Sequence, residues 1–297
     1  MDALPLGRGR GWGLDRRSTF WGLYLPPFLW LCVFFIVPLL LMAAYSFRAD
    51  MRGDLFGSFT PTLKQYTDLF AGGSYWRLLG LSALMAFIIA ISATLLSFPV
   101  AYFLAFRAGR NAGRYLVLLL VPFWTSYLLR VMAWKFMLGS NGVINAFLQY
   151  LGLIDQPLNA LLYNRGTVII TLIYVWVPFA ALPILAALQR IDLSLFEAAS
   201  DLGANTFQRF LRITFPLALP GLLATFFMVF IPTIGEYVTP LLVGGSEGSM
   251  YGNIIQDFFT KAANWPLGSA LSMVMLVGTL VLVFIAVRSI DLRKLVE

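Results

Sequence analysis

The chain of 297 residues has no histidine, one cysteine and few charged residues. Without histidine there is no imidazole base, no histidine-ligated metal or haem and no serine–histidine hydrolase. The single cysteine, Cys32, cannot form an intrachain disulfide or a thiolate cluster. Charged residues make up 12% of the chain, against about 25% in an ordinary soluble domain. These absences exclude a soluble globular enzyme and a disulfide scaffold.

Lysine is scarce as well. The four lysines are Lys64, Lys135, Lys261 and Lys294, and none follows a glycine or precedes a serine or threonine. A P-loop ends in Gly-Lys-Ser/Thr, so this chain cannot hydrolyse ATP by that route. We therefore expect no cofactor or metal on this chain. If it takes part in ATP-driven transport, ATP and Mg²⁺ bind to another polypeptide.

Hydrophobic residues make up 60% of the chain and are gathered into long runs. A hydrocarbon core of about 30 Å is crossed by about 20 residues of helix. Continuous apolar runs favour helices over barrel strands, which alternate apolar and polar residues. Six runs qualify, at residues 20–47, 79–106, 115–138, 167–188, 220–243 and 267–287. The sequence thus predicts an all-α integral membrane domain of six transmembrane helices over residues 20–287, between terminal segments 1–19 and 288–297.

The formal net charge is +7, and the basic residues divide unequally between the two sides of the predicted membrane. Six lie in long connections on one side: Arg48, Arg52, Lys64, Arg77, Arg165 and Lys261. Thirteen lie on the other: Arg8, Arg10, Arg16, Arg17, Arg107, Arg110, Arg114, Arg190, Arg209, Arg212, Arg288, Arg293 and Lys294. The positive-inside rule places the thirteen, and both termini, in the cytoplasm. Because the charges form short clusters between apolar runs, they do not indicate nucleic-acid binding.

The cytoplasmic connection at about residues 189–219 has the features of folded structure. Ser194 and Glu197 have the spacing of a capping box, which predicts a helix over residues 195–202. Gly203 is placed to end that helix in the left-handed conformation.

A second short helix is predicted directly after this glycine. Asn205 can cap it, with Gln208 three residues on, and Pro216 and Pro220 end it and begin the next span. Three apolar side chains fall on one face at spacings of three and four: Phe207, Phe210 and Leu211. An exposed apolar patch of this kind suits a helix pair resting on lipid headgroups as well as a docking site for a soluble partner.

The same connection carries a family signature. Glu197-Ala198-Ala199, Gly203 after three residues and Ile213-Thr214-Phe215-Pro216 after nine more resemble the EAA signature of ABC importer permeases. Phe215 stands where that family usually has leucine. The resemblance implies that the segment is the coupling helix, which sits in a cleft of a cytoplasmic ATPase. It implies ATPase-coupling roles for Glu197, Ala198, Ala199, Gly203, Phe207, Phe210, Ile213 and Pro216.

Motifs outside this connection resemble the spermidine/putrescine branch of the same permeases. They are Val177-Pro178-Phe179, Leu182-Pro183, residues 231–237, Gly244-Gly245, residues 252–256 and residues 265–268. The resemblance implies a type I ABC importer permease in a bacterial inner membrane, with polyamines or a related small solute as substrate. It also implies three kinds of protein partner: a cytoplasmic ATPase dimer, a second related permease subunit and a soluble substrate-binding protein.

Glu236 is the one acidic residue inside a predicted span, and a buried ionisable group there indicates function. It follows Gly235 and lies between Pro232 and Pro240, so we expect a local break in its helix. A polyamine cation is bound well by a carboxylate and by aromatic faces. The candidate pathway residues are therefore Glu236, Tyr237, Tyr174, Trp176, Trp124 and Tyr127.

Arg130 gives Glu236 a second possible role. At about 1.5 Å per residue, Arg130 lies roughly 22 Å into the third span and Glu236 roughly 24 Å into the fifth. Both spans run outward, so the two charges share a depth in the bilayer. A structural ion pair is slightly favoured over a substrate ligand.

A secondary carrier or channel without an ATPase is the alternative function. Such proteins have inverted repeats with paired broken helices. The two halves of this sequence do not match each other, and the structured cytoplasmic connection occurs once. The sequence therefore favours the ABC permease.

Overall fold

The computed structural model describes residues 16–49, 60–158 and 161–289. Within these ranges the regular structure is helical, apart from one isolated bridge between Arg48 and Pro61. Five helices are long and apolar enough to cross a bilayer, and a sharply bent pair counts as a sixth if it is one span. The prediction of an all-α membrane fold is confirmed. Most of the predicted terminal segments 1–19 and 288–297 lies outside the described residues.

The long helices coincide with five of the six predicted runs, but α4 begins six residues before its run. The fifth run, predicted at 220–243, differs at both ends, because the helix begins at Thr206 and α11 ends at Ile234. In the first, α1 and α2 are joined by a π-helical turn, and in the fifth α10 runs through a second π-helical turn into α11. Their bounds are α1 Arg16–Leu31, α2 Val37–Ser46, α4 Gly73–Phe106, α8 Arg165–Leu188, α10 Thr206–Arg209, α11 Phe215–Ile234 and α13 Trp265–Ser289.

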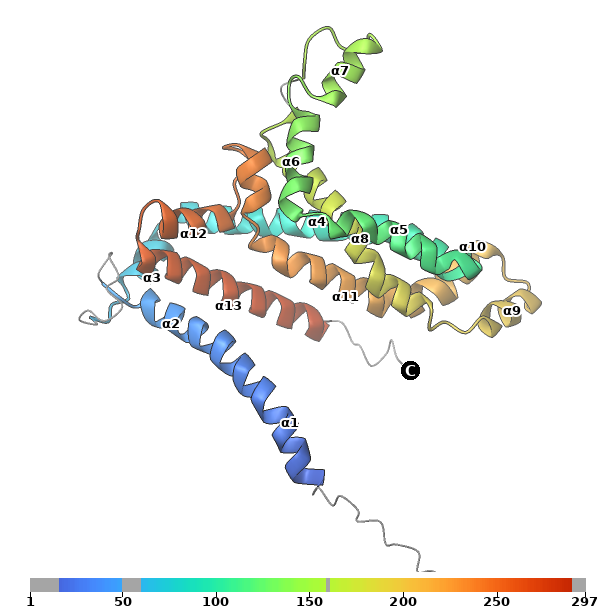
Figure 1. The fold of residues 1–297 in the computed structure, drawn as a ribbon, viewed down its shortest axis with the longest axis horizontal. Helices are drawn as coiled ribbons and strands as arrows, with labels where there is room; N and C mark the ends of the chain where they lie inside the picture. Colours follow the sequence, from blue (N-terminus) through green and yellow to red (C-terminus); the bar gives the residue numbers. More distant parts are fainter. Residues whose placement is uncertain (1–15, 50–59, 159–160, 290–297) are drawn as a thin grey trace, which may run out of the picture.

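Shorter helices lie at the ends of the bundle and in the connections. The helices α3 and α12 lie at one end, and α9 lies with α10 at the other (Figure 1). The remaining bounds are α3 Lys64–Ala71, α5 Ala112–Trp124, α6 Tyr127–Leu138, α7 Val143–Tyr150, α9 Ser194–Asp201 and α12 Tyr251–Thr260.

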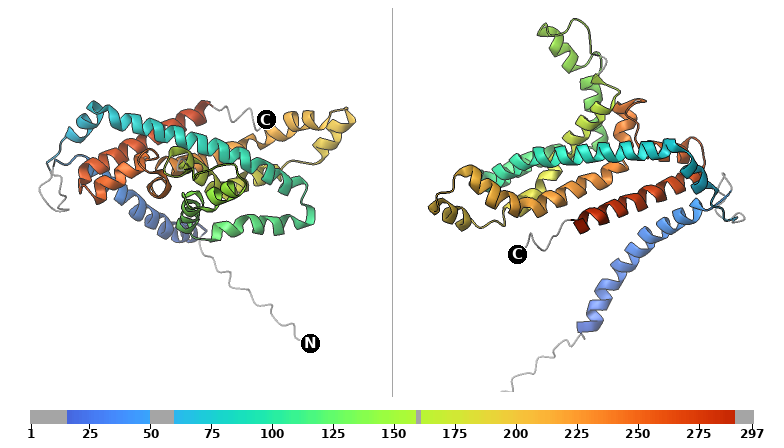
Figure 2. Two further views of the ribbon diagram at one scale, coloured as in Figure 1. Left: turned by 90° about the horizontal axis from the view of Figure 1, so that it is seen from above. Right: turned by 180° about the vertical axis from the view of Figure 1, so that it is seen from behind.

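Three helices, α4, α8 and α11, lie side by side and form the core of the bundle (Figures 1 and 2). Small residues let their backbones approach closely: a Cβ added at Gly221 of α11 would lie 2.5 Å from the Cβ of Ala187 in α8. Hydroxyl groups join the helices, as where Ser97 donates to the carbonyl oxygen of Val177 at 2.9 Å. Close contact and interhelical hydrogen bonds are what hold helices together in lipid.

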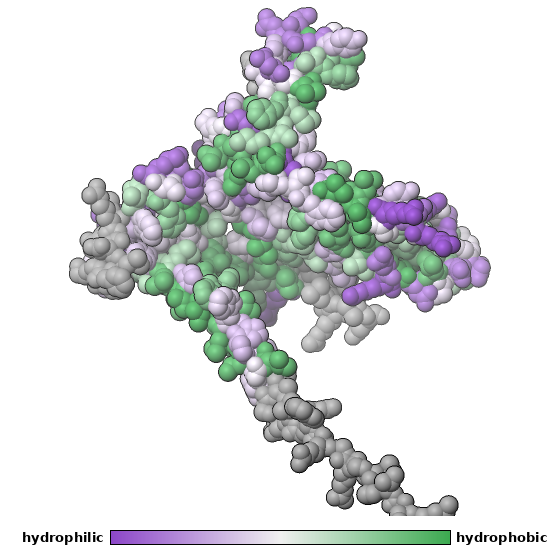
Figure 3. All heavy atoms as spheres, in the orientation of Figure 1, coloured by the Kyte–Doolittle hydropathy of each residue, from purple (hydrophilic) through white to green (hydrophobic). Residues whose placement is uncertain are grey.

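The first span and α13 lie outside this core. The helix α2 packs against α13, while α1 diverges from the bundle (Figure 1). On the face seen in Figure 3, apolar residues are spread along the bundle, and hydrophilic residues gather at the end that carries α9 and α10 and at the tip of α7. This distribution suits a bundle that crosses a bilayer with α9 and α10 at one aqueous surface.

The third predicted span is not one straight helix. It is divided into α5 and α6, which meet at a bend of 82°. Thr125 and Ser126 are extended between them, and Pro122 lies one turn before the break. An extended dipeptide interrupts the helical hydrogen-bond ladder, so α6 leaves the direction of α5 and projects from the bundle together with α7 (Figure 1). The first residues of α6 still pack in the core, where Val131 has no exposed surface. Apolar length alone did not reveal this bend.

Candidate functional site

The connection between α8 and α11 folds into two short helices at one end of the bundle, as Figure 2 shows. The first, α9, begins at Ser194, so this serine is the first residue of the helix and not its N-cap. The Ser194 N–H donates to Asp192 Oδ1 at 2.9 Å, and this bond holds the pKa of Asp192 below its usual value. The predicted Ser194–Glu197 capping box is therefore wrong, because the carboxylate of Asp192 accepts the hydrogen bond at the start of the helix.

The turn between α9 and α10 agrees with the prediction. Gly203 has a φ of +79°, a conformation that residues with a Cβ adopt at a cost. The side chains of Asn205 and Gln208 then form a reciprocal capping box at the start of α10. The two short helices are thus joined by a sharp turn of defined geometry.

Arg209 ties the two short helices together. Its Nη1 donates to Ser200 Oγ of α9 at 2.8 Å, and its Nη2 donates to Thr206 Oγ1 of α10 at 3.3 Å. We call the unit from Asp192 to Thr214 the coupling segment. Its two helices are held at a fixed angle by the glycine turn and by this arginine.

The predicted coupling residues fall into two groups. Glu197, Ala198, Gly203 and Phe207 are exposed. Leu202 and Phe207 are 88% and 68% exposed at the tip. The others are half-buried at the base: Ala199, Phe210, Ile213 and Pro216. Phe207, Phe210 and Leu211 do not share one exposed face, because Phe210 packs against Phe98 of α4.

Pro216 does not end the second short helix. The chain stays helical from α10 through the π-helical turn Phe210–Thr214 into α11. The proline is the second residue of α11 and directly follows the π-helical turn, an irregular stretch at which helices commonly accommodate a proline. Consequently α10 is the inner end of the fifth span, and a movement of the coupling segment acts directly on α11.

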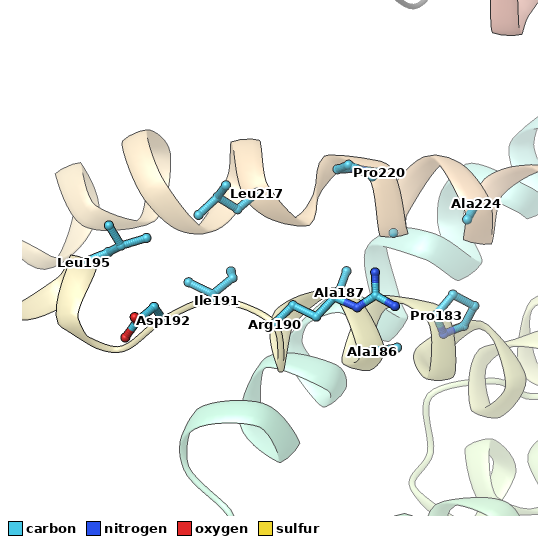
Figure 4. Close-up of a pocket in the computed structure, with 11 residues that line it drawn as sticks. Pro183, Ala186, Ala187, Arg190, Ile191, Asp192, Leu195, Leu217, Pro220 and Ala224 are labelled. Atoms are coloured by element: carbon cyan, nitrogen blue, oxygen red, sulfur yellow. The ribbon is translucent and has the colours of Figure 1, made fainter. Parts of the chain in front are cut away.

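A groove of about 600 Å³ opens where the coupling segment meets α8 and α11 (Figure 4). Its walls are mostly small and apolar, with Arg190 and Asp192 among the lining residues. Gly221 of α11 closes against Ala187 and Pro183 of α8 there. The groove therefore runs along the junction of two core helices.

A second group of polar residues lies at the predicted break in the fifth span. The helix α11 ends at Ile234, and residues 235–237 are not helical, as expected from the glycine and prolines around Glu236. Glu236 Oε1 accepts hydrogen bonds from the N–H groups of Val238 at 2.8 Å and Thr239 at 3.1 Å. The carboxylate thus caps the short helical stretch that follows the break.

The breaks in the third and fifth spans are side by side. Tyr127, the first residue of α6, hydrogen-bonds through its hydroxyl to the hydroxyl of Thr239. The same hydroxyl lies near Glu236 and Arg130. Sequence reasoning named Tyr127 and Glu236 but missed Thr239, whose partner lies 112 residues away.

The predicted ion pair between Arg130 and Glu236 is not formed. Among the described residues, the salt bridge within 4.0 Å is the one between Lys261 and Asp257. Arg130 is 8% exposed; its Nη1 donates to the Val175 carbonyl oxygen at 3.5 Å, and its guanidinium lies 5.6 Å from the Phe123 ring centre. One carboxylate oxygen of Glu236 is instead occupied by backbone N–H groups. Arg130 and Glu236 were predicted to lie at the same depth in the bilayer, but equal depth did not bring their side chains into contact.

The other aromatic candidates are not gathered around Glu236. Tyr174 packs edge-on against Trp134, with ring centres 5.5 Å apart, and Trp176 packs on Phe179 at 6.3 Å. Trp124 is 73% exposed and Tyr237 is 42% exposed. Of the predicted aromatic residues, Tyr127 is the one whose hydroxyl binds Thr239, the residue whose N–H is capped by Glu236.

Known proteins resemble this chain over most of its length. It is 36% identical to the spermidine/putrescine transport system permease protein PotB of Haemophilus influenzae, covering 88% of this chain and 91% of that protein. The PotB of Escherichia coli K12 is also 36% identical, over 86% and 92%. The inner membrane ABC transporter permease protein YdcU of Escherichia coli is 32% identical, over 85% and 83%.

Solved structures share the fold at lower identity. A chain of a bacterial ABC transporter involved in the import of the acidic polysaccharide alginate has a TM-score of 0.72 at 18% identity, covering 93% of this chain and 97% of that one. A chain of the MetNI methionine ABC transporter has a TM-score of 0.53 at 17% identity, over 74% and 94%.

Residues 97–294 match the family of binding-protein-dependent transport system inner membrane components. That stretch contains the coupling segment, three of the long helices and both helix breaks. The chain belongs to this family and is a multi-pass inner membrane permease subunit of a binding-protein-dependent importer.

Proposed function

We propose that this permease imports polyamines and is driven by a cytoplasmic ATPase dimer that grips the coupling segment. The observation that carries the proposal is the tip of that segment, where Leu202 and Phe207 are exposed on a rigid turn. Large apolar side chains at a polar, water-facing end of the molecule are typical of a docking surface. ATP and Mg²⁺ belong to the ATPase, since this chain has no Gly-Lys-Ser/Thr sequence.

A second permease subunit and a soluble binding protein complete the proposed transporter. In the described part of the chain, only 6% of the most apolar stretch of the first span is buried. Its sides are therefore available to contact lipid or the second permease. The orientation has both termini in the cytoplasm. In support of this, α1 begins and α13 ends toward the end of the bundle that carries α9 and α10 (Figure 1).

The polyamine substrate rests on the names of the relatives and on the chemistry at the paired breaks. The PotB relatives are named as spermidine/putrescine transport system permeases. Broken helices expose backbone carbonyl oxygens, which bind ammonium groups, and Glu236 adds a carboxylate. Tyr127 joins the two breaks, and Tyr237 is exposed beside Glu236. Tyr174, Trp176 and Trp124 remain candidates for the walls of the pathway.

Replacing Gly203 by valine tests the ATPase drive. A β-branched residue resists a φ of +79°, so Gly203→Val distorts the turn while the bundle stays intact. We expect normal membrane insertion, loss of the co-purifying ATPase and loss of energised uptake. Gly113→Val is the matched control, because an added Cβ meets no atom within 4 Å there and its φ is not positive. Full-speed uptake by Gly203→Val would refute the proposal in favour of a carrier or channel.

Replacing Glu236 by glutamine tests the cation site. The amide oxygen of glutamine can still accept from the N–H groups of Val238 and Thr239, so the cap is kept while the charge is removed. For a substrate ligand, we expect uptake of labelled spermidine to fall about tenfold or more at normal protein abundance. Unchanged uptake would limit Glu236 to its capping role and remove it from the pathway.

A further inference from the structure

The coupling segment contacts a core helix to which it is not joined in sequence. Phe196 of α9 meets Phe106 of α4 edge-on, with ring centres 5.5 Å apart and planes at 74°. Phe210, at the base of the segment, meets Phe98 of α4 at 5.7 Å and 83°. Edge-to-face pairs at these distances are attractive beyond their buried area. The coupling segment therefore contacts α4 at two points, through Phe196 of α9 and through Phe210 of the π-helical turn.

The two points on α4 are linked along the helix. Tyr102 lies between them, with its ring centre 6.2 Å from that of Phe98 and 5.0 Å from that of Phe106. Residues four apart lie on one helical face, so the three rings form a stripe. We call the stripe and its two partners the aromatic ladder: Phe98, Tyr102, Phe106, Phe196 and Phe210.

The arrangement around the ladder suits the transfer of movement. Arg209 holds α9 and α10 together, so Phe196 and Phe210 move as one body. A cavity of about 360 Å³ lies beside the rings, lined by Tyr102, Phe106, Phe196 and Phe210 among others. The rings therefore bridge the coupling segment and α4 beside this open space.

The ladder also begins next to a weak point of α4. Pro99 lies inside the helix and cannot donate to the carbonyl oxygen of residue 95, which makes a bend there easier. Just before it, Ser97 fixes α4 to the Val177 carbonyl oxygen of α8. The inner end of α4, whose buried Ala101 and Leu104 pack with α8, can thus bend relative to the part that is fixed at Ser97.

We propose that the aromatic ladder carries movement of the coupling segment to α4, with Phe196 and Phe106 as positioning residues for transport. The proposal rests on the proposed function, in which an ATPase moves this segment. It adds a third route to the two covalent ones through α8 and α11. All three core helices are then driven together.

The test uses the complete transporter, reconstituted in proteoliposomes with its ATPase, second permease and loaded binding protein. Spermidine taken up per ATP hydrolysed is compared for Phe196→Ala, Phe106→Ala and the control Phe103→Ala. Phe103 makes a similar edge contact at 5.5 Å, to Tyr115 of α5, near the same end of α4 but away from the coupling segment. We expect the ratio to fall about twofold to tenfold in the first two variants and to stay at the wild-type value in the control.

Conservative variants of Phe196 distinguish the transfer of movement from a role in packing alone. Phe196→Tyr keeps the ring and should restore the ratio, whereas Phe196→Leu keeps most of the volume and should not. If Phe196→Ala does not accumulate, the Leu and Tyr variants carry the test. A wild-type ratio in Phe196→Leu, with the ATPase still bound, overturns the proposal. Failure of the wild-type chain to bind an ATPase refutes the proposed function instead.

Discussion

The core helices and the outer helices of this protein are about equally apolar but differ greatly in burial. The most apolar windows of α4, α8 and the fifth span have mean hydropathies of 2.3, 2.3 and 2.1, with 39%, 50% and 39% of the window buried. Those of the first span and α13 have higher values, 2.5 and 2.7, with 6% and 11% buried. Hydropathy therefore identifies a spanning helix without indicating whether it packs in the core.

Side-chain size and hydroxyl groups explain the difference. On α4 the buried face carries Ala86, Ala90 and Ala93, each with no exposed surface, whereas Leu280 and Phe284 of α13 are 60% and 64% exposed. In lipid a large apolar side chain gains little by moving from acyl chains to protein. Helices associate where small residues permit close contact, and many of the large side chains on the outer helices face outward.

The largest effect is expected at the closest helix contact. In Gly221→Leu, the new Cβ would lie 2.5 Å from Ala187 and 3.0 Å from the carbonyl oxygen of Pro183, so α8 and α11 must separate. We expect the free energy of unfolding to fall by more than about 3 kcal/mol, with loss of membrane abundance. Thermal unfolding in detergent measures it. Gly278→Leu in α13, where an added Cβ meets nothing within 4 Å, should be tolerated. Equal effects in the two variants would break the distinction between core and outer helices.

A smaller effect is expected when a large side chain is shortened. Leu172 of α8 has no exposed surface and Leu280 of α13 is 60% exposed. Leu172→Ala should lower the free energy of unfolding by about 1–2 kcal/mol, because the cavity remains while the transfer from water does not apply in lipid. Leu280→Ala should change it by less than about 0.5 kcal/mol. A large loss at Leu280 would mean that a partner subunit, and not lipid, covers α13.

The smallest effect is expected from single hydroxyl groups. The buried Thr225 hydroxyl donates to the Ala180 carbonyl oxygen at 3.2 Å, joining α11 to α8. The buried hydroxyl of Thr279 in α13 has no hydrogen-bond partner among the residues that the structure describes. Thr225→Val should lower the free energy of unfolding by about 0.6 kcal/mol, while Thr279→Val should leave it unchanged or raise it. Chemical denaturation measures both variants. If Thr279→Val lowered the free energy of unfolding more than Thr225→Val, interhelical hydrogen bonds would not distinguish the core helices from the outer ones.

The coupling segment shows which local features can be predicted. Gly203 and the pair Asn205–Gln208 behave as expected, since a left-handed turn and a reciprocal cap depend on residues within three positions of each other. The start of α9 was misassigned because the helix begins one residue earlier than predicted and Asp192, not Ser194, accepts the hydrogen bond there. Phe210 was placed with Phe207 on one exposed face; the π-helical turn that begins at Phe210, and its contact with Phe98, remove it from that face.

The polar groups inside the membrane were harder to place. The helix break at Glu236 was predicted from the nearby glycine and prolines, and residues 235–237 are not helical in the structure. The choice of Val175 over Glu236 as the partner of Arg130 depends on the 82° bend between α5 and α6, which reorients every residue of α6. Helical rise gave the depth of each charge but not the direction in which its side chain points.

By itself, the sequence determined that this chain spans a membrane as helices, which connection is structured and where its turn falls. These follow from the length of apolar runs and from backbone preferences of single residues, which act over a few positions. Tertiary structure alone decided which helices form the core, how the two breaks meet and that the coupling segment grips α4. Those outcomes depend on contacts between residues far apart in the chain, and their fit is set by shape in three dimensions.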